Sequence, residues 1–180
     1  MKPNVRPSMR AMIDASSAIL LVKAGLIELC CQMFRLQMTR MVFEEVTVPD
    51  HEGAERLKIS AERRPGIEVI GDPTSRLGGQ VAAELQGLHR GERDSLNHCL
   101  YGMARFVIID DGPGVRVCRR LGIPHVNALL CPKLLLFSGI ISQRRANLFS
   151  TRIIALGRYN ETVRHWAETC GPSDLAFFLD

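Results

Sequence analysis

The sequence predicts an α/β fold in which a central parallel sheet lies between two layers of helices, a three-layer α/β/α sandwich. Short apolar segments typical of strands alternate along the chain with segments of helical periodicity. The two clearest strand segments are nearly continuous apolar runs, which is typical of parallel strands covered on both faces. Of the 180 residues, 46% are hydrophobic and 23% are charged, the composition of an ordinary globular domain.

The first half of the chain is predicted to contain three strands and the helices that connect them. Ser16 and Ser17 follow the first apolar run and are typical helix caps, and Gly25 ends the helical pattern after them. Residues 47–65 are polar and are expected to form a solvated helix and loops. In chain order, the other expected elements are a strand at 9–14, helices at 18–25 and 26–34, a strand at 34–38, one or two helical turns at 40–46 and a short strand at 66–73.

The second half contains the clearest predicted strand, an apolar run over residues 106–111 that ends in two aspartates. Gly122 ends the helix that follows this strand, and Gly87 and Gly91 interrupt the helical pattern before it. In chain order, the expected elements are helices at 80–88 and 91–104, the strand at 106–111, a helix at 114–122, a short strand at 123–126 and helical segments at 128–141 and 143–168.

Composition excludes several protein classes and favours a cytoplasmic location. The chain is neither disordered nor collagen-like in composition, and 23 basic against 19 acidic residues give a net charge of +4, too small to predict an anionic partner. The six cysteines show neither a CxxC pair nor zinc-finger spacing, so we expect free thiols in a reducing cytoplasm. We expect no secretory signal, no membrane span, and one domain with a flexible arm at 1–8 and a C-terminal helical extension at about 142–180.

Carboxylates stand where the two clearest predicted strands end. Asp14 ends the strand at 9–14, and Asp110 and Asp111 end the strand at 106–111. Because the carboxyl ends of parallel strands lie on one edge of a sheet, where α/β proteins bind ligands, we expect these side chains to lie near one another. Further acids begin or end helices that can face the same edge: Glu44 or Glu45, and Glu92 or Asp94.

A cluster of carboxylates requires a compensating positive charge, because like charges a few ångströms apart resist joint ionisation. Mg²⁺ and Mn²⁺ prefer oxygen ligands and supply that charge. A divalent cation held in this way can activate a water molecule and stabilise the leaving oxygen of a phosphodiester. The acids therefore indicate a divalent-cation site and phosphodiester hydrolysis.

Four segments together resemble the PIN-domain nucleases, named after the PilT N-terminus. The segments are IDASSAILLVKAGLIEL, VFEEV, GERDSLNHCL and FVIIDDGPGVRVCRRLGI, in the family's order over about residues 9–140. The GE-x-D motif and the paired aspartates are most similar to the VapC-like toxin branch. The resemblance implies a PIN-like fold and a Mg²⁺- or Mn²⁺-dependent ribonuclease, commonly the toxin of a toxin–antitoxin pair. It also implies a homodimer, RNA as the substrate and a small antitoxin protein as a partner.

The resemblance implies a role for each acidic residue. Asp14 matches the first metal ligand, and Ser16 matches a hydroxyl that supports it. Asp110 competes with Asp111 for the role of the fourth acid, and Glu92 matches a structural carboxylate or one that supports the ligands. The other three ligands, in chain order, match Glu45, Asp94 and Asp111.

Two positions depart from the family's pattern. Thr39 stands where this branch usually has a proline shortly before the second acid, and Gly112-Pro113-Gly114 follows the paired aspartates. These departures favour an alternative, a catalytically inactive PIN-like module that binds nucleic acid or regulates. A receiver-like signalling domain would need a lysine and a threonine at later strand ends, and the strand at 123–126 supplies neither.

Several of these residues also have an ordinary structural interpretation. Asp14 and Asp111 are typical N-caps for the helices after them, and Asp94 can complement the N-terminus of its helix. His98 and Asn97, in the same helix as Asp94, are more often packed or solvated than part of a site. The arginines near the C-terminus form either a solvated face or a surface for RNA or an acidic partner: Arg144, Arg145, Arg152, Arg158 and Arg164.

Overall fold

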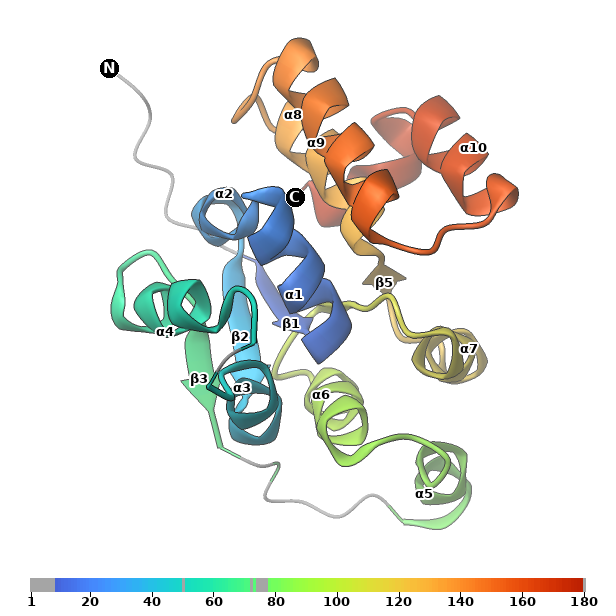
Figure 1. Ribbon diagram of the computed structural model, residues 1–180. Coiled ribbons are helices and arrows are strands. Elements are labelled where there is room, and N and C mark those ends of the chain that lie inside the picture. The colour runs from blue at the N-terminus through green and yellow to red at the C-terminus, as the bar shows by residue number, and fades with distance from the viewer. Residues whose placement is uncertain (1–8, 50, 72, 74–77, 180) are drawn as a thin grey trace.

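The computed structural model describes residues 9–49, 51–71, 73 and 78–179, so the expected arm at 1–8 lies outside the described residues. In the described chain, five strands form one sheet in the order β3-β2-β1-β4-β5 (Figure 1). All strand pairs are parallel, which confirms the predicted α/β fold. The strands are β1 (Arg10–Ile13), β2 (Arg35–Thr39), β3 (Glu68–Ile70), β4 (Phe106–Ile108) and β5 (His125–Val126).

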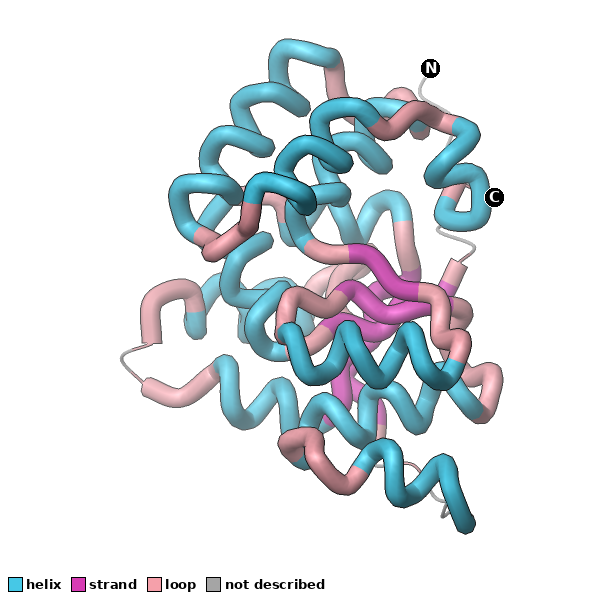
Figure 2. The backbone as a smooth tube through the Cα atoms, turned by 90° about the vertical axis from the view of Figure 1, so that its right-hand side faces the viewer, coloured by secondary structure: helices cyan, strands magenta, loops and turns pink. Residues whose placement is uncertain are grey.

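Helices cover both faces of the sheet, and Figure 2 shows the strands between them. One apolar core lies mainly under α1, α2, α8 and α9, and the other lies under α5, α6 and α7. The helices are α1 (Ala15–Ala24), α2 (Ile27–Met33), α3 (Arg40–Val46), α4 (Ala54–Glu62), α5 (Gly79–Leu85), α6 (Arg90–Leu100), α7 (Gly112–Leu121), α8 (Cys131–Phe137), α9 (Gln143–Leu156) and α10 (Glu161–Thr169), with 3-10 turns η1 (Ala128–Leu130) and η2 (Ser173–Phe178).

The central strands supply side chains to both cores. Ala11 and Ile13 of β1 belong to the first core, and Met12 belongs to the second. The same alternation holds along residues 106–109. Because successive side chains of a strand point to opposite faces, a continuous apolar run buries residues on both sides of the sheet. The runs that predicted parallel strands therefore also explain the two helical layers.

Helix α1 begins three residues before the helix predicted at 18–25, because Asp14 rather than Ser16 or Ser17 is its N-cap. The Asp14 carboxylate accepts a hydrogen bond from the Ser17 backbone N–H at 2.8 Å. This bond satisfies one of the N–H groups that a helix leaves unpaired at its first turn. At the other end, Gly25 adopts a φ of 80° and ends the helix as predicted.

The C-terminal helical stretch is divided more finely than its sequence pattern indicates. α8 ends at Phe137, and Gly139 with a φ of 74° turns the chain before residue 141. The stretch at 143–168 forms α9 and α10, which are separated by residues 157–160. Asn160 is the N-cap of α10 and accepts a hydrogen bond from the Val163 backbone N–H at 2.9 Å.

Composition predicts free thiols and no membrane-spanning helix. All six cysteines are free thiols, as predicted, and only Cys99 among them is not fully buried. Within the described ranges, no individual helix has both the length and the apolar character to cross a membrane. α1 and α2 meet that criterion only when taken together, and they are bent by 110° at the break between them.

Candidate functional site

The ends of β1 and β4 lie side by side, and acidic residues follow both strands. The Asp14 backbone N–H donates to the Ile108 carbonyl at 3.1 Å, which continues the pairing of these strands by one residue. Asp110 and Asp111 follow two and three residues after Ile108. The topology thus places the predicted acids at one edge of the sheet, where parallel α/β sheets bind ligands.

Asp14 is almost completely buried, with 1% of its surface exposed. Its carboxylate accepts hydrogen bonds from the Ser16 hydroxyl at 2.6 Å and the Ser17 backbone at 2.8 Å. The pKa of Asp14 is raised to about 7, mainly by burial and to a smaller extent by the nearby charge of Asp110, while these hydrogen bonds lower it. Near neutral pH both the ionised and the protonated form of the side chain are therefore populated.

Asp111 is the N-cap of α7 and accepts a hydrogen bond from the Gly114 backbone N–H at 2.9 Å. The side chain is partly exposed. A Cβ built on Gly114 would lie 2.4 Å from Ile109 Cδ1, so the first turn of α7 packs closely against the end of β4. Both the cap and this close packing determine the position of the Asp111 carboxylate.

Glu92 occupies the third position of α6, after the N-cap His89. Its carboxylate accepts a hydrogen bond from the His89 backbone N–H, the bond that an N3 glutamate makes in a capping box. The second oxygen, Oε2, is buried and has no hydrogen-bond partner in the part of the chain that the structure describes. Burial raises the pKa of Glu92, and the negative charge of Asp111 raises it further. Glu92 therefore has a free acceptor close to a second carboxylate.

One cavity, with a volume of about 460 Å³, is lined by Asp14, Glu45, Glu92 and Asp111 together with Ser16. The four acids come from the N-termini of α1 and α7, from α3 and from α6. Apolar residues of α1 and α3 form part of the wall, among them Ile19 and Met41. Sequence segments far apart in the chain thus bring four carboxylates to a single cavity, which we call the acidic pocket.

Asp94 and Asp110 do not line the acidic pocket. Asp94 faces two arginines, with its oxygens 3.7 Å from Arg90 Nε and 4.0 Å from Arg93 Nε. Its place in the pocket is taken by Glu92, because residues two apart on a helix point in directions about 200° apart. Asp110 instead accepts hydrogen bonds from three groups outside the pocket, described below.

Glu44 and Glu45 differ in their position relative to the acidic pocket. Both lie in α3 and both are exposed, but only Glu45 lines the acidic pocket. Thr39, which departs from the family's pattern, is the N-cap of α3, and its hydroxyl accepts from the Val42 backbone N–H at 3.2 Å. The threonine therefore starts the helix that carries Glu45.

His89 and Arg90 line the acidic pocket, and sequence reasoning did not identify them. They directly precede the GE motif, so their position at the start of α6 was the available signal. Two other polar residues of α6 lie outside this pocket. His98 Nε2 lies 3.1 Å from the Gly71 carbonyl, and Asn97 Oδ1 is buried with no hydrogen-bond partner within the described ranges.

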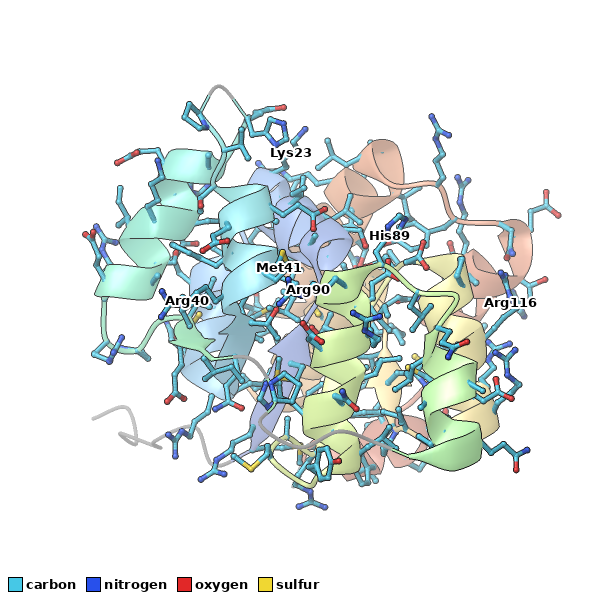
Figure 3. The ribbon with its side chains drawn as sticks, turned by 90° about the horizontal axis from the view of Figure 1, so that it is seen from below. Lys23, Arg40, Met41, His89, Arg90 and Arg116 are labelled. Atoms are coloured by element: carbon cyan, nitrogen blue, oxygen red, sulfur yellow. The ribbon has the colours of Figure 1, made fainter. Side chains whose placement is uncertain are left out.

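Two exposed arginines flank the acidic pocket. Arg40 directly precedes the wall residue Met41, and Arg116 Nη1 lies 3.5 Å from the position of a Cβ built on Gly112, next to Asp111. Figure 3 shows Arg40 and Arg116 on opposite sides of the labelled wall residues. Three of the C-terminal arginines lie in α9, which packs against the side of α1 that α3 does not occupy (Figure 1): Arg144, Arg145 and Arg152.

The acidic pocket contains the type of ligand atom that a hard divalent cation prefers. Its four carboxylates offer only oxygen ligands, and the buried Glu92 Oε2 has no hydrogen-bond partner among the described residues. As the side chains are placed, however, no three His, Cys, Asp or Glu residues of the described chain converge closely enough to hold one ion. The pocket therefore has the ligand type but not the side-chain geometry of a formed metal site.

Comparison with known proteins supports the interpretation of the fold. A family model described as a PIN domain matches residues 10–155, which include all five strands and every residue of the acidic pocket. Searches of curated proteins and of solved structures find no significant match. Because the match covers most of the chain, the chain belongs to the PIN-domain family, whose members are typically nucleases.

Proposed function

We propose that the protein is a Mg²⁺- or Mn²⁺-dependent endoribonuclease that hydrolyses RNA phosphodiester bonds at the acidic pocket. The observation that supports this most strongly is the gathering of Asp14, Glu45, Glu92 and Asp111 around one cavity. Their mutual repulsion and the burial of Asp14 and Glu92 favour a positive ligand in the pocket, because a cation lowers the cost of keeping them ionised.

In this proposal the four pocket acids hold the cation, and Glu92 replaces Asp94 in the set that the family resemblance implies. A bound cation would supply an activated water and neutralise charge that develops at the scissile phosphate. The chain's own groups orient the ligands: Ser16 and Ser17 hold the Asp14 carboxylate, and Gly114 holds that of Asp111. These bonds keep the acids in place before the substrate binds.

Arg40 and Arg116 are proposed to bind the RNA backbone on either side of the pocket. Both side chains are exposed, and a guanidinium group can contact two phosphate oxygens at once. A strand that crosses the acidic pocket would meet one arginine before the scissile phosphate and the other after it. The net charge of +4 is small, so this local arrangement is what supports a polyanionic substrate.

The proposal is tested by incubating the purified full chain with a labelled single-stranded RNA and Mn²⁺ or Mg²⁺. Glu45→Gln should lower the cleavage rate at least tenfold, because it removes one negative ligand from the pocket. Glu44→Gln, one residue away on the same helix and outside the pocket, is the matched control and should leave the rate within about twofold. Equal rates for the two variants, or no cleavage by the unmodified protein with either metal, would refute the proposal.

The toxin role, the antitoxin and the homodimer are proposals that rest on the family resemblance. If the protein is a toxin, its expression should arrest growth, and Asp14→Asn should relieve the arrest. The product of a neighbouring small reading frame should then bind the purified chain and inhibit cleavage. Sedimentation analysis of the purified chain tests the homodimer.

A catalytically inactive PIN-like module is the second candidate, and one observation favours it: no three ligating side chains of the described residues converge as they stand. Such a module should bind Mn²⁺ no more tightly than an Asp14→Asn, Asp111→Asn double variant. An active nuclease should bind Mn²⁺ much more tightly than that variant. Calorimetric titration of Mn²⁺ into both proteins distinguishes the two functions.

A further inference from the structure

Asp110 is held by three hydrogen bonds, although it lies outside the acidic pocket. The Tyr159 hydroxyl donates to Oδ1 at 2.5 Å, while the Ser17 hydroxyl and the Ala128 backbone N–H donate to Oδ2 at 2.7 and 2.9 Å. Burial raises the pKa of Asp110, and these bonds lower it, that of Tyr159 most. The Asp110 carboxylate therefore joins α1, η1 and the C-terminal part of the chain at the end of β4.

Tyr159 reaches Asp110 from the connection between α9 and α10, which lies beyond the residues that match the family model. Its ring packs against the first apolar core. A Cβ built on Gly157 would lie 2.5 Å from Tyr159 Cε2, so the ring lies directly over this glycine. The local sequence Gly157-Arg158-Tyr159 thus leaves space for the ring to turn inward toward Asp110.

The bonds around Asp110 continue into the acidic pocket. Ser17 donates through its hydroxyl to Asp110 and through its backbone N–H to Asp14, so one residue holds both carboxylates. Asp110 is also bonded covalently to Asp111, whose carboxylate caps α7. A displacement of Asp110 would therefore reach two acids of the pocket by separate routes.

We propose that Tyr159 is a positioning residue for the acidic pocket: by holding Asp110, its hydroxyl fixes Ser17 and the end of β4, and thereby Asp14 and Asp111. The C-terminal segment after residue 155 is then part of the functional unit. The consequence for catalysis rests on the proposed function, whereas the positioning of the two acids does not.

The test is amide hydrogen exchange in the full chain carrying Tyr159→Phe, which keeps the ring and removes only the hydroxyl. Two amides report directly on the pocket, since Ser17 N–H donates to Asp14 and Gly114 N–H donates to Asp111. Loss of a hydrogen bond to a charged group should speed exchange at both amides about tenfold. The control amide is Val42 N–H, which donates to the Thr39 hydroxyl at the start of α3, on another side of the pocket. Its exchange rate reports on the rest of the fold and should be unchanged.

Tyr101→Phe is the matched control, because Tyr101 is the only other tyrosine in the sequence and is exposed in a different loop. Unchanged exchange at Ser17 and Gly114 in Tyr159→Phe would overturn the proposal. Equal acceleration at Val42 would overturn it too, since Tyr159 would then contribute only to overall stability. Gly157→Ala, which displaces the ring, should reproduce the selective acceleration.

A Mn²⁺ titration of the same variants separates this inference from the proposed function. Tyr159→Phe should weaken Mn²⁺ binding about tenfold, within the range seen when groups that orient metal ligands are removed, and Tyr101→Phe should not. If the unmodified protein binds no Mn²⁺, the proposed function fails while the exchange result still decides the positioning role. If it binds Mn²⁺ and Tyr159→Phe binds equally well, the positioning role fails.

Discussion

Asp14 caps α1 and lines the acidic pocket with the same carboxylate. The structural interpretation of this residue as an N-cap is therefore confirmed, and the same carboxylate is placed where the functional interpretation predicts a ligand. Burial makes the ionised form costly, and the hydrogen bonds from Ser16 and Ser17 offset only part of that cost. A residue that destabilises the empty protein is expected where a positive ligand is to bind.

Asp14→Asn should be more stable than the unmodified protein above pH 7. The folded-state pKa of about 7 exceeds the value of 3.8 of a free aspartate, so the folded protein binds more protons between pH 4 and 7. The contribution of Asp14 to the free energy of unfolding therefore falls as pH rises through this window, by up to about 4 kcal/mol. Asparagine can keep both serine contacts and never ionises. The free energy of unfolding of the variant should therefore fall less than that of the unmodified protein as the pH rises through this window.

Thermal unfolding at pH 5 and pH 8 measures this difference, because groups that titrate in both proteins cancel. The same pH dependence in both would contradict the interpretation. Mn²⁺ should narrow the difference in stability at pH 8, since a ligand at 100 times its Kd stabilises by about 2.7 kcal/mol and the variant lacks one carboxylate of the site. Failure of Mn²⁺ to stabilise the unmodified protein would count against the metal site.

Glu92 and Asp94 provide a second prediction, because only Glu92 lines the pocket. Glu92→Gln should weaken Mn²⁺ binding roughly tenfold or more, since it neutralises the carboxylate whose Oε2 lacks a partner. Asp94→Asn should change Mn²⁺ affinity less than about threefold and lower the free energy of unfolding by about 1 kcal/mol, the scale of partly exposed ion pairs. A larger loss of affinity in Asp94→Asn would restore the assignment that the family resemblance implies.

Helices α3 and α6 approach each other at Gly91. A Cβ built there would lie 2.8 Å from Val42 Cγ2 and 3.8 Å from Glu45 Oε2. The absence of a side chain at this position lets the helix that carries Glu92 pack directly against the helix that carries Glu45. The width of the pocket between these acids therefore depends on one glycine.

Gly91→Ala should lower the free energy of unfolding by about 1–3 kcal/mol and weaken Mn²⁺ binding, because α6 must move away from α3. Gly87→Ala is the control: the position is exposed, and a Cβ built there meets no atom within 4 Å. Chemical denaturation and Mn²⁺ titration of both variants check the prediction. A Gly91→Ala protein with unchanged metal affinity would show that this helix contact does not set the geometry of the pocket.

The C-terminal segment completes the first apolar core of the whole molecule. Leu175 of η2 is fully buried, and the Phe178 ring meets the edge of Phe106 in β4 at a centroid distance of 5.0 Å. Residues at the end of the chain thus pack directly on a central strand. We expect the sheet and this segment to unfold together, in agreement with the single domain predicted from the sequence.

Leu175→Ala should lower the free energy of unfolding by about 2–5 kcal/mol without separating the transition into two. Trp166, the single tryptophan, lies in α10 and reports on the C-terminal segment, while far-ultraviolet circular dichroism reports on all helices. Leu148→Ala, at a half-exposed position of α9, should change stability by less than about 0.5 kcal/mol. Different midpoints for the two signals would identify the segment as a separate unit.

Most of the fold could be predicted because its signals are local. The apolar runs at 9–14 and 106–111 contain β1 and β4, and the weaker strands lie where turn residues and short apolar segments indicated them. Two helix boundaries differ from the predicted ones. Asp14 caps α1, so this helix begins three residues before the predicted start. The break at 157–160 contains Tyr159, which turns inward to Asp110, and hydrophobic periodicity does not reveal such a contact.

The amino-acid sequence is sufficient to predict the fold class, the carboxylates that follow the strands and the type of chemistry that carboxylates at one sheet edge indicate. Which of these acids share the pocket depends on tertiary contacts. Glu92 rather than Asp94 lines it, and Asp111 rather than Asp110, because the rotation of α6 and the hold of Tyr159 on Asp110 depend on contacts between distant segments. Local patterns specify elements and burial, whereas the direction of each side chain depends on how the elements pack.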